Sequence, residues 1–145
     1  MLNSNRFNQS LILKNYKELD IYRSSYSLAI KMHHMTMRLP KHELHEEGGQ
    51  ARRSSKGIAS CIVEGYGRRR YKADFIKFLT YAHASCDETI LHLNFIKETH
   101  VKVKDEVDEL LHHYDSLGRK INKFIKYVEM NWKSTRNPQP VTRNP

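Results

Sequence analysis

The C-terminal part of the chain carries a periodic apolar pattern that fits an α-helix and not a strand. Between Val103 and Val128, apolar residues recur at spacings of alternately four and three positions. A helix of about 3.6 residues per turn aligns this spacing on one face, which packs against other helices in a bundle or coiled coil. A further line at Leu111, Gly118, Ile125 and Trp132 widens the face, as expected for contact with more than one neighbour. The seam comprises Val103, Val107, Leu110, Tyr114, Leu117, Ile121, Phe124 and Val128.

Three further helices are predicted upstream of this seam. One covers about residues 72–99 and has an apolar face of the same kind. The first runs from about Asn15 to Arg38 and stops before Pro40, because proline disfavours helical geometry in the residue before it. Another lies between the Gly48-Gly49 pair and the glycines at Gly65 and Gly67. At its end we expect a left-handed cap formed by glycine, which has no Cβ to oppose it.

These patterns predict one all-α domain, an antiparallel up-and-down four-helix bundle over residues 15–132. A chain of 145 residues with 39% hydrophobic residues is long enough to bury a core without disulfides or metal. The two cysteines, Cys61 and Cys86, are accordingly expected to be free thiols. Residues 1–14 are predicted to be a flexible N-terminal segment. Residues 133–145 contain three basic residues and no acid, and we expect a disordered basic tail there.

The predicted first helix carries two apolar stripes about 200° apart, by the helical period. A single core covers only one of them, so the other is expected to meet a second subunit. We therefore predict a homo-oligomer, with the interface formed by the second of the two stripes. The first stripe is Leu19, Tyr22, Tyr26, Ile30, His33 and Met37. The expected interface residues are Ile21, Leu28, Met32 and Met35.

Positive charge is concentrated between Gln50 and Lys72, where seven of the chain's 25 basic residues meet one acid, Glu64. Such a cluster, in a chain of net charge +9, favours an anionic partner and above all the phosphate backbone of RNA or DNA. The alternative is that these cations only solvate a helix face or pair with acids elsewhere. Tyr66 and Tyr71 are better explained as packing residues than as base-stacking ones, so sequence-specific recognition is not predicted. The predicted phosphate-binding residues are Arg52, Arg53, Lys56, Arg68, Arg69, Arg70 and Lys72.

No catalytic, metal or cofactor site is predicted, and we expect a protein that is not an enzyme. Glu109 and His112 have the Glu-x-x-His spacing of di-iron bundles, but their helical phase points them toward solvent. His42 and His45 lie in a predicted turn and lack further ligands at zinc-site spacing. Serine, cysteine and histidine are scattered without a nucleophile motif. No run approaches the roughly 18 apolar residues of a membrane span, and we expect a cytoplasmic protein.

The segment Gly57–Gly65, GIASCIVEG, resembles a family signature. It is similar to the Ser-Ile-Pro-x-Asn-Ile-Ala-Glu-Gly motif of the proteins named for the intervening sequence of the large-subunit ribosomal RNA gene. Asp74-Phe75 and Phe78-Leu79 extend the resemblance downstream, and it covers about residues 16–128. Departures from the motif include Gly57 for Ser, Cys61 for Asn and Val63 for Ala.

This resemblance implies a four-helix bundle that assembles into a ring, most often described as a pentamer, without known enzymatic activity. A distant relative is the accessory protein of diversity-generating retroelements, which partners a reverse transcriptase and binds nucleic acid. We therefore expect a non-enzymatic homo-oligomeric scaffold that binds RNA or DNA through backbone phosphates. The alternative is a protein-interaction module, an accessory subunit for a reverse transcriptase or a ribosome-associated partner.

Overall fold

The computed structural model describes residues 15–134 and contains four long α-helices, as the sequence predicts. The predicted flexible segment 1–14 and the predicted tail from residue 135 onward lie outside the described residues. Within residues 15–134 there is no β-strand. The long helices are α2 (Asp20–Met37), α3 (Glu47–Gly67), α4 (Lys72–Thr99) and α5 (Lys104–Asn131). Short 3-10 helices are η1 (Tyr16–Glu18), η2 (Lys41–Leu44) and η3 (Val101–Val103).

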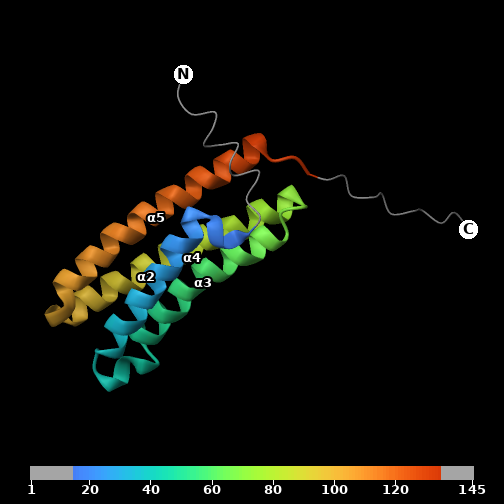
Figure 1. Cartoon of the computed structure of the whole chain (residues 1–145). Coiled ribbons are helices and arrows are strands. Elements are labelled where there is room, and N and C mark those ends of the chain that lie inside the picture. The colour runs from blue at the N-terminus through green and yellow to red at the C-terminus, as the bar shows by residue number, and fades with distance from the viewer. Residues whose placement is uncertain (1–14, 135–145) are drawn as a thin grey trace, which may run out of the picture.

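The four helices alternate in direction, so the bundle has up-and-down topology (Figure 1). Each helix packs on the next in sequence, and α2 also contacts α5, which closes the ring of four. The contact between α3 and α4 is the most extensive, and that between α2 and α5 is the least. The α2–α3 and α4–α5 connections lie together at one end of the bundle, opposite the α3–α4 turn (Figure 1).

All four helices contribute to the core, and α4 and α5 do so with the apolar faces that the sequence predicts. In α5 the seam is buried at six of its eight positions, while Val103 and Phe124 are half-buried. Phe124 packs edge-to-face on Phe75 of α4, with ring centroids 5.9 Å apart. Burying a side chain of this size stabilises the fold by about 1.5–3 kcal/mol. The buried residues of α4 are Phe75, Leu79, Ala82, Cys86, Thr89, Leu93 and Ile96.

Helix α2 corrects the interface expected from its two stripes. Ile21, Leu28, Met32 and Met35, which the sequence predicts to contact another subunit, are at most 7% exposed and belong to the core of the single chain. The residues left on the surface come from the other stripe: Tyr26 is 55% exposed, Ile30 43% and Met37 50%. The two stripes are similarly apolar, so the periodicity alone does not show which one faces α3 and α5.

Helix α3 differs from the prediction at both ends. It begins at Glu47, so Gly48 and Gly49 lie in its first turn. A Cβ on Gly48 would lie 2.6 Å from the carbonyl oxygen of Glu43, so these glycines let η2 approach the helix closely. At the other end the expected left-handed glycine cap is wrong, because the capping residue is Arg68 with φ −98°. Its N–H donates to the carbonyls of Glu64 and Gly65, so the chain needs no glycine to leave the helix.

Candidate nucleic-acid interface

Arg52, Arg53 and Lys56 lie on α3, but their side chains differ in what they contact. The half-buried Arg52 donates to Thr36 Oγ1 at 3.0 Å and to the Leu44 carbonyl at 2.5 Å, and thereby holds α3 against the end of α2 and η2. Arg53 is exposed and forms no ion pair or side-chain hydrogen bond within residues 15–134. Lys56 is exposed, and its Nζ lies 3.3 Å from His33 Nδ1. Of the three, Arg53 and Lys56 are available to a phosphate.

Lys56 of α3 contacts His33 of α2 at the surface of the bundle. Partial burial, and after it the positive charge of Lys56, lowers the pKa of His33. A neutral imidazole offers an unprotonated nitrogen, which here accepts a hydrogen bond from the lysine. Because this bond lies at the surface, an incoming anion displaces it at little cost.

The cations of the α3–α4 turn are mostly held by neighbouring groups. Arg68 pairs with Glu64 at 2.9 Å and Asp74 at 3.6 Å, and the Glu64 hydrogen bond and charge raise the pKa of this guanidinium. Arg69 lies over the Tyr66 ring at 4.0 Å and donates to the Tyr66 carbonyl. Tyr66 is buried and so packs rather than offering a free ring to bases.

Lys72 and Arg69 also join this turn to the end of α5. Lys72 Nζ donates to the Glu129 carbonyl at 2.5 Å, and Trp132 Nε1 donates to the Arg69 carbonyl at 2.8 Å. A cation near the last carbonyls of a helix satisfies acceptors that have no partner in the helix. Lys72 therefore has a structural role, while Arg70 remains exposed at the turn.

The seven predicted cations do not form one surface patch. Lys56 and Arg68 are twelve positions apart along α3 and its cap, which corresponds to about 18 Å along the helix axis. The predicted set therefore divides into a group on α3 and a group at the α3–α4 turn. Within this set Arg68 pairs with nearby acids, whereas Arg53 and Lys56 are exposed and have no acidic partner among the described residues.

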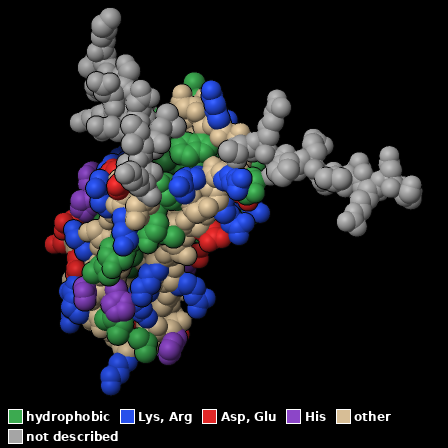
Figure 2. Space-filling view, turned by 45° about the vertical axis from the view of Figure 1, so that its right-hand side comes forward, with side chains coloured by type: hydrophobic (Ala, Val, Ile, Leu, Met, Phe, Trp, Pro, Cys, Tyr) green, Lys and Arg blue, Asp and Glu red, His purple; other side chains and the backbone are tan. Residues whose placement is uncertain are grey.

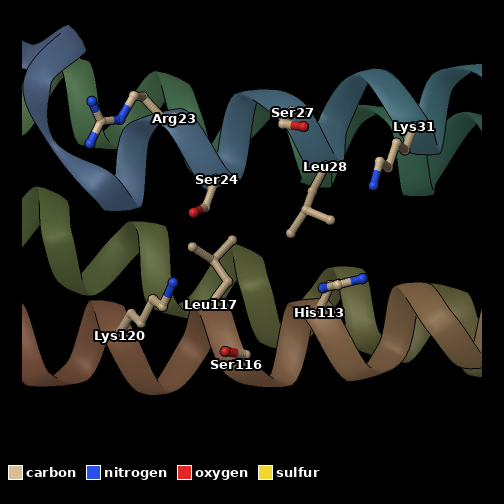
Figure 3. Close-up of a pocket in the computed structure, with 9 residues that line it drawn as sticks. All are labelled: Arg23, Ser24, Ser27, Leu28, Lys31, His113, Ser116, Leu117 and Lys120. Carbon is tan, nitrogen blue, oxygen red and sulfur yellow. The ribbon is translucent and has the colours of Figure 1, made fainter.

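A polar groove that the sequence does not reveal lies between α2 and α5, with a volume of about 340 Å³. Figure 3 shows α2 contributing side chains from above and α5 from below, with Leu28 and Leu117 pointing toward each other between the helices. Basic and hydroxyl side chains surround these two leucines. They are Arg23, Lys31, His113, Lys120, Ser24, Ser27 and Ser116.

Positive charge dominates the rim of the groove. Arg23 and Lys31 are exposed and form no ion pair or side-chain hydrogen bond within the described residues. Lys120 pairs with Asp20 across the two helices at 3.2 Å, and both side chains are about half or more exposed. A second ion pair between the helices, Arg38 with Glu106, lies at the other end of α2. Exposed pairs of this kind contribute at most about 1 kcal/mol each, so Lys120 is readily available to another anion.

The groove could not be found from the sequence because it combines two helices that are distant in the chain. On α2, Ser24, Ser27 and Lys31 are spaced by three and four residues, and on α5 His113, Ser116 and Lys120 repeat that spacing. Each set follows one edge of its helix. The packing of α2 beside α5 brings these two polar edges together into one groove.

A model of the 23S rRNA-intervening sequence protein family matches residues 17–123. The chain belongs to this family. The match begins in η1 and ends within α5, so it includes the basic segment and the groove. A comparison with curated proteins found no match. None of the described helices is long and apolar enough to cross a membrane.

The family motif, Gly57–Gly65, lies in α3 and has a packing role. Ile58 and Ile62 are fully buried, and a Cβ on Gly65 would lie 3.0 Å from Phe78 Cβ of α4. Cys61, which replaces the family's usual asparagine, is a half-buried free thiol. The motif therefore accounts for the close contact between α3 and α4, while the exposed cations lie outside it.

Proposed function

We propose that this protein is a non-enzymatic, homo-oligomeric helical-bundle scaffold that binds RNA or DNA through backbone phosphates. The observation that carries the proposal is the α2–α5 groove, whose rim bears Arg23, Lys31 and Lys120 together with serine hydroxyls. Lysine and arginine release condensed counterions when they meet phosphates, and hydroxyl groups add neutral hydrogen bonds to the same oxygens. The exposed Arg53 and Lys56 on α3 supply a second cationic surface.

Self-association is supported by the apolar side chains that α2 leaves on the surface. Tyr26, Ile30 and Met37 lie at helical spacing, and each is more than 40% exposed. In Figure 2 hydrophobic side chains form a broken line among basic and histidine side chains on one face of the bundle. Burying such a line against a second copy removes apolar area from water. A symmetric assembly would also repeat the cationic groove and so strengthen the capture of a polyanion.

Light scattering tests the assembly. At micromolar concentration the wild-type protein should show a mass larger than one chain, and Ile30→Glu should lower it. Leu91→Glu provides a matched control, because Leu91 is similarly exposed on α4, away from the α2 stripe. A monomeric wild-type protein, or loss of the oligomer only in Leu91→Glu, would contradict the proposed interface.

Fluorescence anisotropy with labelled RNA and DNA of unrelated sequences tests the phosphate contacts. The triple variant Arg23→Ala/Lys31→Ala/Lys120→Ala should bind all of them more weakly. The slope of log affinity against log salt should become shallower, by about 2–3. The control removes three exposed cations elsewhere, at Lys77, Lys102 and Lys104. Equal loss in both triple variants would show that net charge, and not the groove, determines binding.

A protein-interaction module is the second candidate, and two side chains of α4 favour it. Leu91 and Phe95 are 51% and 48% exposed and lie one turn apart. A partner helix or groove could cover this pair. Binding of such a partner should change little between low and high salt, whereas phosphate binding should weaken steeply. If the protein shows no affinity for nucleic acid at about 50 mM salt, this second candidate replaces the first.

A further inference from the structure

Two imidazoles and one carboxylate meet where the α2–α3 connection contacts the end of α4. His42 and Glu43 belong to η2, and His100 is the residue that caps α4. His42 and Glu43 are 57 or more residues from His100 in the chain, yet one ligand atom from each of the three side chains lies within 4.8 Å of the other two. The two imidazole rings are 6.0 Å apart, centroid to centroid.

The two imidazole nitrogens converge on one carboxylate oxygen. Glu43 Oε1 lies 2.9 Å from His100 Nε2 and 3.5 Å from His42 Nε2. A tetrahedral zinc ion binds nitrogen and oxygen at about 2.0–2.2 Å, which places its ligand atoms about 3.3–3.5 Å apart. The observed separations therefore need only small side-chain movements to admit a metal ion. His42 can make them, because its side chain is 64% exposed.

The carboxylate is fixed in a way that suits a ligand. The side chain of Glu43 is only 7% exposed, and that of His100 is 15% exposed. The other carboxylate oxygen, Oε2, accepts a hydrogen bond of 3.1 Å from the N–H of Gly48 in the first turn of α3. A hydrogen bond to the non-ligating oxygen orients a metal-bound carboxylate. Oε1 is thereby directed at the two imidazoles.

We propose that His42, Glu43 and His100 bind a divalent transition-metal ion of the zinc type. Two imidazoles and one carboxylate form a donor set that zinc takes up with water in the fourth position, here on the exposed side of His42. The ion would join the α2–α3 connection to the end of α4. Its effect on the bundle is to tie two loops together at the end opposite the α3–α4 turn. This site is independent of nucleic-acid binding.

The sequence predicts no metal site, and it places His42 and His45 in a turn without further ligands. In the structure His45 is not part of the group. Glu43 and His100 replace it through the packing of two connections. Glu109 and His112, the other candidates, are exposed on α5, as their phase predicts.

Calorimetry and thermal unfolding of tag-free, chelator-treated protein with ZnCl₂ test the proposal. The wild type should bind one Zn²⁺ per chain and unfold at a higher temperature when the metal is present, because a ligand that binds the folded state stabilises it. His42→Ala and His100→Ala should each weaken binding by about 100-fold or more, since the loss of a direct ligand costs at least as much as the loss of a supporting group. Co²⁺ should give a visible absorption band that both variants lose.

The control variant is His45→Ala, which removes a neighbouring exposed histidine and should bind zinc as the wild type does. Because His42 is exposed, its replacement is not expected to unfold the protein. Glu43→Gln gives a second test, since the glutamine side chain keeps an acceptor for the Gly48 N–H. Two results would overturn the proposal: no saturable zinc binding by the wild type, or equal binding by His42→Ala. Either would show that the three side chains form a hydrogen-bonded cluster alone.

Discussion

Two glycine substitutions in α3, at Gly48 and at Gly67, distinguish the effect of close packing against η2 from the effect of helix propensity. Gly48→Ala would place its Cβ 2.6 Å from the carbonyl oxygen of Glu43, whereas a Cβ on Gly67 would have nothing within 4 Å. The first contact is about 1 Å shorter than the usual separation of non-bonded heavy atoms. Because the clashing atom belongs to the backbone, η2 must move away from α3 to relieve it.

The expected magnitudes follow from these two environments. Alanine is preferred over glycine inside a helix by up to about 1 kcal/mol, and less near its ends. Overpacking costs about 1–3 kcal/mol. Gly48→Ala should therefore lower the free energy of unfolding by about 1–2 kcal/mol, whereas Gly67→Ala should leave it unchanged or raise it by up to about 1 kcal/mol.

Urea unfolding followed by circular dichroism measures the difference directly. The two variants should share the wild-type m-value, so that any shift of the midpoint reports stability. A Gly48→Ala protein as stable as Gly67→Ala would refute the argument, because it would mean that the η2 turn yields without cost.

Three more predictions follow from burial and pairing. Ile121→Ala, at a fully buried seam position, should lower the free energy of unfolding in urea by about 2–5 kcal/mol, whereas Phe124→Ala, at a half-buried position, should lower it by about 2 kcal/mol. A larger loss of stability for Phe124→Ala than for Ile121→Ala would contradict this packing. Burial raises the pKa of Cys86 to about 12, so in a Cys61→Ser background a thiol reagent at pH 8 should modify Cys86 only in urea. Replacing Arg68–Arg70 with alanine should weaken nucleic-acid binding less than the groove variant does, with helical content unchanged, since Glu64 and Tyr66 already hold two of these cations.

Much of the fold could be predicted from the sequence because helical periodicity is a local property. The bounds of α4 and the buried seam of α5 agree with the pattern, since each helix has one dominant apolar face. The pattern fails for α2, where two stripes compete and only the position of the neighbouring helices decides which is buried. It also fails at the end of α3, where Arg68 rather than a glycine caps the helix.

The candidate sites were harder to predict because each depends on contacts across the bundle. Of the cations that charge density singled out, Arg53 and Lys56 are exposed, but Arg52 and Lys72 are bound to neighbouring backbone groups. The groove requires that α2 and α5 be adjacent, and the histidine–glutamate cluster requires that two loops meet. Neither condition leaves a signal at short range in the chain.

The limited contact between α2 and α5 has a consequence for the motions of the bundle. Among the contacts between neighbouring long helices, the α2–α5 contact is the least extensive, and the Asp20–Lys120 and Arg38–Glu106 pairs that cross it are exposed to solvent. Local opening between α2 and α5, detectable by amide hydrogen exchange, should therefore be easier than separation of α3 from α4. Salt screens such pairs, so α2 amides should exchange faster as ionic strength rises, while those of α3 should change little. The two edges of the groove would then belong to parts of the protein that separate and close again.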